Sequence, residues 1–254
     1  MKRFITLALC LFVSVVTYAQ TQVIAHRGYH ATKNSYDNTI SSLINAQKLK
    51  VYGSEVDIHE TSDGVLIAIH GMRHRDIKNV QKATFEELTT IPLENGETIP
   101  TLEQYLEQAK KSKKTKLIIE IKSHPTKEQE ARVVKNILAA VKQHKLVKNV
   151  EYIAFSKYIC DQLVKNAPRG TKIAYLNGDL TPEQCKKERY TGIDSNLNTL
   201  KAHPEWINKC HELGLTVNVW TVNDKKDMQW FIDMGVDYIT TDKPDVLKRM
   251  LKNK

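Results

Sequence analysis

The stretch KLIIEIKSHPTKEQEARVVKNILAAVKQH, residues 116–144, contains one complete strand-to-helix unit. Its first six residues form a short apolar run rich in β-branched side chains, which predicts a buried strand over 116–121. Residues 127–144 carry apolar side chains at helical spacing, namely Val133, Val134, Ile137, Leu138 and Val141. Between them, Thr126 is followed three residues later by Gln129, which is the spacing of a capping box at a helix start.

The same alternation of strand and helix extends along the chain in both directions. Eight short apolar segments are candidate strands: 22–26, 52–57, 116–121, 151–155, 172–176, 191–195, 215–219 and 236–240. Thr101 with Gln104 and Thr181 with Gln184 repeat the capping-box spacing, and Pro182 suits a first helical position. Strands that alternate with helices form parallel sheets, and eight such units in this length are typical of a (β/α)₈ TIM barrel, an α/β fold.

One segment departs from this alternation. IHETSDGVLIAIHG, residues 58–71, leaves no room for the crossover helix that two parallel strands require. Asp63-Gly64 is a tight-turn signal between two alternating runs, so we expect a β-hairpin and a short insertion after the second strand. With these two residues at the centre of the turn, the register would place Asp57 opposite His70.

The amino-terminal residues have the layout of a secretory signal. Residues 1–19 combine a basic start at Lys2 and Arg3 with an apolar stretch at 4–16 and small residues at the end. A membrane anchor is the rival interpretation, but the apolar stretch is short for a membrane span. We therefore expect signal removal, export to the periplasm or the medium, no stable membrane insertion afterwards, and a single domain over 20–254.

Composition limits the classes of partner. The formal net charge is +9, but the lysine-rich stretches lack the interleaved aromatic residues of a nucleic-acid stacking surface, so no nucleic-acid partner is expected. Cys160, Cys185 and Cys210 match no zinc-site spacing, and we interpret them as core or helix residues with one disulfide possible. Nothing in the sequence indicates an oligomeric state.

Polar side chains gather at the predicted carboxyl ends of the strands, which meet at one mouth of a barrel. Glu55 and Asp57 lie on the same side of one strand because side chains repeat every second residue, and Glu120 and Lys122 repeat the arrangement. Three converging carboxylates repel one another, and a divalent cation removes that repulsion. Ligands that are all oxygen suit calcium or magnesium, and Arg27 and Lys122 would then bind phosphate oxygens.

His26 and His70 complete the predicted site. Two histidines on opposite sides of a metal-bound phosphate can serve as general base and general acid in phosphodiester cleavage. Each of these residues alone has a structural interpretation, as a hydrogen-bonded histidine, a strand ion pair or, for Trp220, a core aromatic. Their shared position at one end of the predicted barrel favours a catalytic site.

Six segments in the same order resemble the glycerophosphodiester phosphodiesterase family: IAHRG, EVDIHETSDGVLIAIH, IPTLEQYL, LIIEIK, VNVWTVND and GVDYITTDKPD. The resemblance implies a TIM barrel, one bound Ca²⁺ or Mg²⁺, and hydrolysis of small glycerophosphodiesters to glycerol 3-phosphate and an alcohol. It also implies residue roles: catalytic His26 and His70, metal ligands Glu55, Asp57 and Glu120, phosphate contacts Arg27 and Lys122, and Trp220 against the glycerol part.

Three features depart from the family pattern. The acid that usually follows the second histidine is replaced by Gly71, the usual Glu-Asn-Thr is Asp-Asn-Thr at 37–39, and the insertion at 71–98 is short and basic.

We expect His59 and His124 to lie behind the site, and His74 to help bind an anionic head group. The alternatives are a phospholipase- or sphingomyelinase-type enzyme on the same barrel, or a non-catalytic binder of phosphorylated ligands. Polar loops and the intact histidine pair argue against both.

Overall fold

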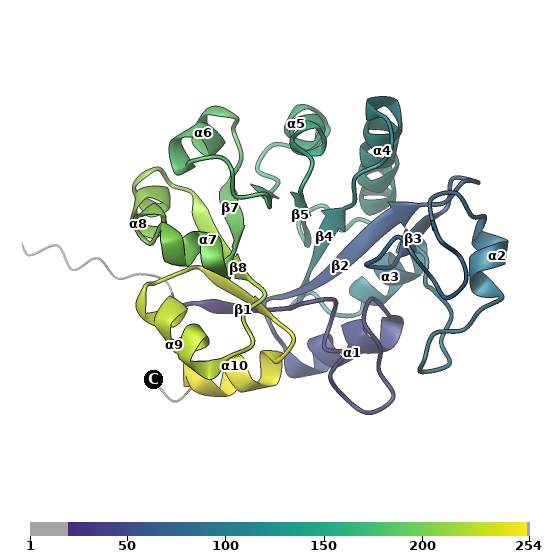
Figure 1. Cartoon of the computed structure of the whole chain (residues 1–254), viewed down its shortest axis with the longest axis horizontal. Coiled ribbons are helices and arrows are strands. Elements are labelled where there is room, and N and C mark those ends of the chain that lie inside the picture. Colours follow the sequence, from purple (N-terminus) through teal and green to yellow (C-terminus); the bar gives the residue numbers. More distant parts are fainter. Residues whose placement is uncertain (1–19, 253–254) are drawn as a thin grey trace, which may run out of the picture.

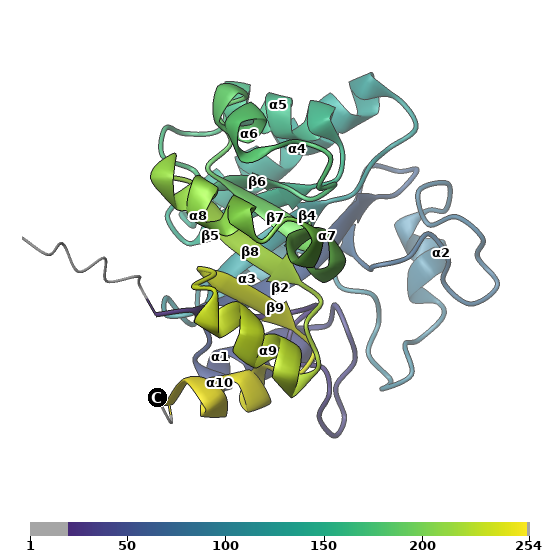
Figure 2. The ribbon, with the colours of Figure 1, turned by 60° about the vertical axis from the view of Figure 1, so that its left-hand side comes forward.

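The computed structural model describes residues 20–252, and the predicted signal at 1–19 lies outside them. Eight parallel strands close into a barrel with helices outside, as predicted, and β1 pairs with both β2 and β9 (Figures 1 and 2). Each predicted segment forms one barrel strand. The strands are β1 (Gln22–Ala25), β2 (Gly53–Glu60), β4 (Lys116–Ile121), β5 (Val150–Ala154), β6 (Ile173–Tyr175), β7 (Gly192–Asn196), β8 (Thr216–Trp220) and β9 (Tyr238–Thr241).

The helices of the described residues cover the outside of the barrel, except for one in the insertion. They are α1 (Ile40–Leu49), α2 (Phe85–Thr89), α3 (Leu102–Ala109), α4 (Lys127–Gln143), α5 (Lys157–Asn166), α6 (Pro182–Lys187), α7 (Leu197–Ala202), α8 (Glu205–Glu212), α9 (Lys225–Asp233) and α10 (Pro244–Lys252). The capping boxes predicted at Thr101, Thr126 and Thr181 are confirmed, and Thr39 and Thr84 form two more. Within residues 20–252, no helix has the length and apolar character needed to cross a membrane.

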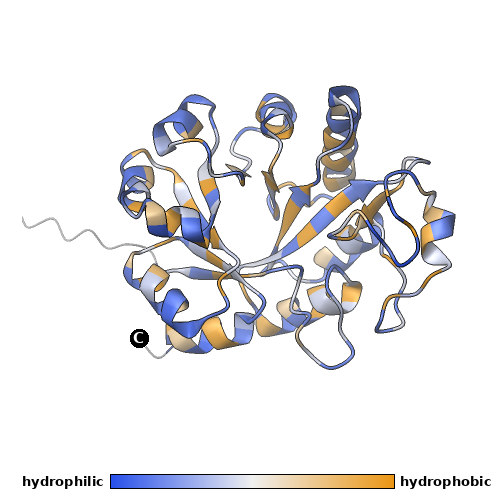
Figure 3. Ribbon diagram, viewed as in Figure 1, coloured by the Kyte–Doolittle hydropathy of each residue, from blue (hydrophilic) through white to orange (hydrophobic). Residues whose placement is uncertain are grey.

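The core is divided by the strands into two layers. Outward-facing strand residues such as Val217 and Ile239 pack against the helices, whereas Ile24, Ile118 and Ile153 fill the middle of the barrel. Figure 3 shows hydrophobic residues on the strands and on the helix faces turned toward them, with hydrophilic residues on the outer faces. The barrel centre is therefore packed, and polar side chains are left for its mouth.

The three described cysteines are buried inside this core. Cys160, Cys185 and Cys210 are all free thiols, so the disulfide that the sequence allowed does not form between them.

The predicted hairpin is present, but its predicted register is wrong by one residue. Strand β3 (Leu66–Ala68) pairs antiparallel with β2, and Ile58 lies opposite Ala68. Asp57 lies opposite Ile69, whose backbone nitrogen donates to the Asp57 carbonyl oxygen at 3.1 Å. His70 therefore follows the paired segment instead of facing Asp57.

The composition of the turn explains this register. Thr61 pairs with Val65, and their backbones are joined by a 2.9 Å hydrogen bond from the Thr61 nitrogen. The Thr61 hydroxyl also accepts from the Val65 nitrogen at 2.9 Å, which fixes three residues in the loop instead of two. Gly64 closes the loop with φ = +84°, the conformation that the last residue of a three-residue hairpin loop requires.

The insertion at 71–98 has a small core of its own. Val80, Leu88 and Leu93 from the insertion pack with Ile67 of β3 and Ile99. The hairpin is thereby attached to a packed layer beside the barrel mouth, at the right of Figure 1.

A tight turn follows β1 and sets the position of Arg27. Gly28 has φ = +79°, and a Cβ atom at this position would lie 2.3 Å from the Ser42 hydroxyl oxygen. The Arg27 carbonyl oxygen accepts from the Ser42 hydroxyl at 3.0 Å and from the Asn38 nitrogen at 3.1 Å. The absence of a side chain at residue 28 is therefore what allows α1 to approach the turn.

We expect Gly28→Ala to lower the free energy of unfolding by about 2–4 kcal/mol, because it adds overpacking to left-handed backbone strain. Gly64→Ala is the matched control: Gly64 has a similar φ, but nothing lies within 4 Å of its added Cβ, so we expect a loss of about 1 kcal/mol. Urea unfolding of both variants measures the difference. Equal losses would show that contact with Ser42 carries no cost.

Candidate active site

The three predicted acidic residues meet at the barrel mouth. Glu55 and Asp57 lie on the inner face of β2, and Asp57 is the direct neighbour of Glu120 on β4. All three are buried, and one oxygen from each lies within 4.8 Å of the others. The i, i+2 spacing predicted from sequence therefore produces a compact acidic cluster, defined as Glu55, Asp57 and Glu120.

The two predicted cationic side chains contact this cluster. Lys122 Nζ lies 2.6 Å from Asp57 Oδ1 and 2.5 Å from Glu120 Oε1. Arg27 Nε lies 3.7 Å from Asp57 Oδ2, and the Arg27 backbone nitrogen donates to Glu55 Oε2 at 2.7 Å. Lys122 and Arg27 thus offset much of the repulsion between the acids, and both remain at the surface of the cavity described below.

Burial and mutual repulsion raise the pKa values of Glu55 and Glu120, whereas Lys122 lowers that of Asp57. Burial, with the Asp57 and Glu120 charges adding to it, raises the pKa of Glu55 well above its ordinary value. Burial followed by the Asp57 charge raises the pKa of Glu120 to about 7. Burial also opposes ionisation of Asp57, but the neighbouring Lys122 ammonium outweighs it and lowers the pKa of Asp57 to about 2.

This donor set fits a hard divalent cation. Glu55 Oε1 is buried without a hydrogen-bond partner among the described residues, so one carboxylate oxygen is available for a ligand. Asn38 donates to Asp57 Oδ2 at 2.8 Å and holds that carboxylate in place. Carboxylate oxygens are the ligands that calcium and magnesium prefer, so the acidic cluster could hold either ion.

His26 lies at the carboxyl end of β1 and is held by a carboxylate that the sequence interpretation missed. His26 Nδ1 lies 2.7 Å from Asp242 Oδ1, and His30 Nε2 lies 3.3 Å from the same oxygen. Burial favours the neutral form of Asp242, but the hydrogen bonds with His26 and His30 outweigh it and lower its pKa well below the usual range. Because an ionised carboxylate only accepts, Nδ1 of His26 carries the hydrogen and Nε2 is left for other partners.

Asp242 could have been found in the sequence. It directly follows β9 in TTDKPD, the same strand-end position that identified the other site residues, but no role was assigned to it.

His70 lies at the returning end of the hairpin and lines the same cavity as His26. Burial lowers the pKa of His70, Asp57 opposes this effect, and Arg27 and Lys122 reinforce it. Gly71 follows His70 where a carboxylate would otherwise stand, and no described side chain takes over as a hydrogen-bond partner of the ring.

The predicted site residues line one cavity of about 120 Å³ at the barrel mouth. Trp220 and Phe155 form its aromatic wall, with ring centroids 5.6 Å apart and planes at 84°. Asp194 lies beside this wall and was not predicted. The full lining is His26, Arg27, Glu55, His70, Glu120, Lys122, Ile153, Phe155, Leu176, Asp194, Trp220, Thr221 and Thr240, with Asp57 in contact through Lys122.

Several other polar residues near the barrel mouth have structural roles. The Ser156 hydroxyl caps α5 and donates to Glu130 at 3.0 Å. His124 accepts from the Glu60 backbone nitrogen at 3.1 Å, and His59 Nδ1 is 2.9 Å from Gln81, so both lie behind the site as expected. The buried His74 ring is bonded to the Ile91 carbonyl oxygen at 2.9 Å, which anchors the insertion loop.

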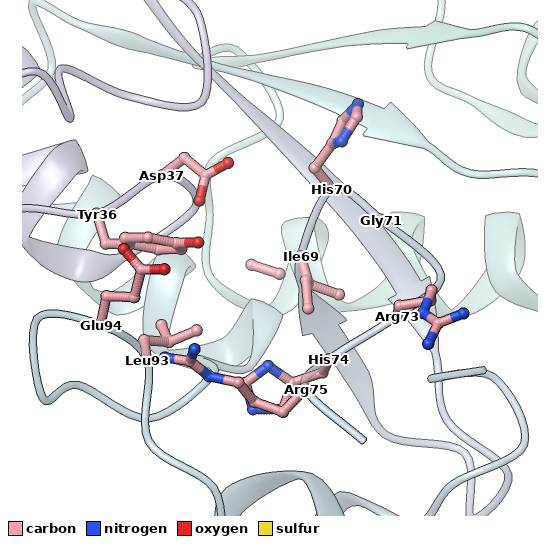
Figure 4. A pocket seen from close by; sticks show the side chains of 11 residues that line it. Tyr36, Asp37, Ile69, His70, Gly71, Arg73, His74, Arg75, Leu93 and Glu94 are labelled. Atoms are coloured by element: carbon pink, nitrogen blue, oxygen red, sulfur yellow. The ribbon is translucent and has the colours of Figure 1, made fainter. Parts of the chain in front are cut away.

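A second cavity, of about 340 Å³, adjoins the first and shares His70 with it. Figure 4 shows Tyr36, Asp37 and Glu94 on one side of this cavity and the loop carrying Arg73, His74 and Arg75 on another. Asp37 is bonded to Arg27 at 3.3 Å, so the two cavities are also linked through that pair. Arg73 and Arg75 both line this cavity, and neither forms an ion pair within residues 20–252.

Comparison with known proteins agrees along nearly the whole described chain. The model of the glycerophosphoryl diester phosphodiesterase family matches residues 26–246. A glycerophosphodiester phosphodiesterase from Caldanaerobacter subterraneus subsp. tengcongensis is 30% identical over 251 residues, covering 92% of this chain and 98% of the relative.

Solved structures of similar proteins share the fold. A glycerophosphodiester phosphodiesterase from Parabacteroides distasonis has a TM-score of 0.90 and 43% identity, covering 93% of this chain and 99% of that chain. A phosphodiesterase from Oleispira antarctica, solved in complex with its product sn-glycerol-3-phosphate, has a TM-score of 0.80 and 19% identity, covering 92% and 98%.

We expect calcium or magnesium to raise the melting temperature more at about pH 8 than at about pH 5. Because the folded protein raises the pKa values of Glu55 and Glu120, their contribution to stability is present below the ordinary glutamate pKa and is lost as pH rises through the raised pKa, which is about 7 for Glu120. A cation bound to the ionised cluster restores that loss. Burial lowers the pKa values of His59, His70 and His124, and the Asp57 charge acts on the first two, so a variant at Glu120 is needed to separate the acids from the histidines.

Thermal unfolding with added metal and with a chelator, at both pH values, measures this difference. Glu120→Gln serves as the control and should reduce both the metal shift and its pH dependence. An equal shift at the two pH values would contradict metal binding at these carboxylates.

Proposed function

Because the chain belongs to the glycerophosphoryl diester phosphodiesterase family, whose members are hydrolases, we propose that it cleaves glycerophosphodiesters to glycerol 3-phosphate and an alcohol with a divalent cation and His26 and His70. The observation that carries this proposal is the single cavity that brings both histidines, both cationic side chains and the acidic cluster together. The product bound in the Oleispira antarctica neighbour supports the same chemistry.

We propose Glu55, Asp57 and Glu120 as the metal ligands. A bound Ca²⁺ or Mg²⁺ would supply charge neutralisation for a phosphodiester oxygen. Lys122 then binds a phosphate oxygen once its two carboxylate contacts are satisfied by the ion, and Arg27 holds a second oxygen with its guanidinium group.

His26 is assigned as the general base. Its Nδ1 is held by Asp242 at 2.7 Å, so Nε2 can accept the proton of the nucleophile while the carboxylate stabilises the imidazolium that forms. The nucleophile is a water molecule or a neighbouring hydroxyl of the substrate, and both have the same requirement for a base.

His70 is assigned as the general acid. It lies on the boundary between the catalytic cavity and the second cavity, where the departing alcohol would lie. The phosphodiester brings negative charge beside His70, which offsets the effect of burial on its pKa and favours the protonated donor.

The two ends of the substrate are assigned to different surfaces. The glycerol part lies against Trp220, and the alcohol head group lies in the second cavity, which offers the Arg75 guanidinium and the Glu94 carboxylate. These charged walls favour a polar, deacylated diester over an intact lipid.

We also propose export, with 1–19 as a signal peptide and the single domain 20–254 acting in the periplasm or outside the cell. The basic and apolar layout of the first nineteen residues supports this proposal.

We expect the purified protein to release glycerol 3-phosphate from glycerophosphocholine in the presence of calcium or magnesium. A chelator should abolish the release, and added metal should restore it, because the acidic cluster repels the phosphate unless a cation is bound. A coupled glycerol 3-phosphate assay measures this, with sphingomyelin and lysophosphatidylcholine as comparison substrates. Full activity in excess chelator would contradict metal dependence, and preference for either lipid would favour the phospholipase-type alternative.

We expect His26→Ala and His70→Ala each to lower kcat by about 10² to 10⁴, the usual contribution of a general acid or base. Circular dichroism and melting temperature should stay near those of the unchanged protein. His203→Ala is the control, because His203 stacks on Trp206 outside both cavities and its loss should leave kcat unchanged. Normal turnover by a folded His70→Ala variant would refute its assignment.

A further inference from the structure

Asp194 is a buried carboxylic acid that the proposed reaction does not use. It lies on the inner face of β7 and is 1% exposed, and it lines the catalytic cavity. Its neighbour in the sheet is Asn218 on β8. A carboxyl group at this depth in a barrel is costly unless something hydrogen-bonds to it.

The protein supplies little to satisfy this carboxyl group. Asp194 Oδ1 is buried without a hydrogen-bond partner among the described residues. Asn218 lies beside Asp194, and a side-chain hydrogen bond between them favours the ionised carboxylate, although burial outweighs it and raises the pKa of Asp194 to about 7. Asn218 also exchanges hydrogen bonds with Thr240: its Nδ2 donates to Thr240 Oγ1 at 2.9 Å, and its Oδ1 accepts from the same hydroxyl at 3.2 Å. One acceptor oxygen of a residue that lines the cavity is therefore left without a partner among the described residues.

The surroundings of Asp194 suit a small polyol. The Trp220 indole nitrogen donates to the Asp194 carbonyl oxygen at 3.0 Å, which fixes the ring of Trp220 next to this carboxyl group. Phe155 packs edge to face against Trp220 and extends the aromatic wall. A three-carbon polyol presents C–H groups that pack on aromatic rings and O–H groups that donate to carboxyl oxygens.

We propose that Asp194 is a specificity residue that accepts a hydrogen bond from a hydroxyl of the substrate's glycerol part, and so selects polyol phosphates over phosphates without hydroxyls. This inference rests on the proposed function and names the group that recognises one half of the substrate. Asp194 contacts the substrate away from the reacting phosphorus, because Arg27, Lys122 and the acidic cluster occupy the phosphate end of the cavity. Its loss therefore weakens recognition of glycerol more than of phosphate.

The test compares two probes that differ only in the hydroxyl-bearing carbons: sn-glycerol 3-phosphate and methyl phosphate. Calorimetry measures their dissociation constants with calcium-loaded protein, for the unchanged chain, Asp194→Ala, Asp194→Asn and Ser195→Ala. Ser195 is the matched control, because it adjoins Asp194 on β7, is also 1% exposed, and lies outside the cavity lining. Asp194 has no partner that its removal would leave unpaired at Oδ1, so the variants should fold, and melting temperatures verify this.

We expect Asp194→Ala to weaken binding of glycerol 3-phosphate by about tenfold, the effect of removing one buried hydrogen-bond partner of a substrate hydroxyl. The dissociation constant of methyl phosphate should change by less than about twofold in the same variant. Asp194→Asn retains one oxygen acceptor and should keep part of the affinity for glycerol 3-phosphate. Ser195→Ala should leave the dissociation constants of both probes unchanged.

Equal weakening of both probes by Asp194→Ala, or no weakening of either, would overturn the assignment. So would an unchanged chain that binds the two probes equally. Turnover of glycerophosphocholine is measured in parallel: absent turnover with intact, Asp194-dependent glycerol 3-phosphate binding would contradict the hydrolase proposal and leave this assignment standing.

Discussion

Electrostatic balance at the barrel mouth is the constraint on which the rest of the site depends. Three carboxylates cannot be buried together and ionised unless positive charge meets them. Lys122 bridges Asp57 and Glu120, and the turn after β1 directs the Arg27 backbone nitrogen at Glu55. The same charges that hold the acids together are those that a phosphate would take over when a cation occupies the cluster.

The β-hairpin supplies the part of the site that a plain barrel would lack. It interrupts the alternation of strand and helix, so His70 returns to the mouth from the hairpin whose first strand carries Glu55 and Asp57. The insertion packs its own apolar core under the hairpin, and the second cavity lies between this layer and the loop after β1. One histidine thus borders both cavities, which links the reacting phosphate to the surface where a head group would bind.

The family assignment and the side-chain contacts of this chain give different information about the site. The comparisons identify the family and its hydrolase chemistry, and the structure adds the contacts of this chain. Asp242 holds His26, whereas among the described residues no carboxylate is hydrogen-bonded to the ring of His70, which is followed by Gly71. The structure therefore fixes the ring of His26 with a carboxylate and leaves the ring of His70 without one. The proposed base and acid roles are based on this difference.

Interactions between residues close in sequence determine most of the fold and could be predicted. The features that the sequence analysis missed depend mostly on contacts between residues far apart in sequence. The eight strands, three capping boxes and the acidic spacing could be predicted because each depends on residues a few positions apart. The hairpin register could not, because the Thr61 hydroxyl competes for a backbone group and lengthens the turn. Asp242 beside His26 and Asp194 beside Trp220 needed the closed barrel, since only closure brings strands far apart in sequence around one cavity.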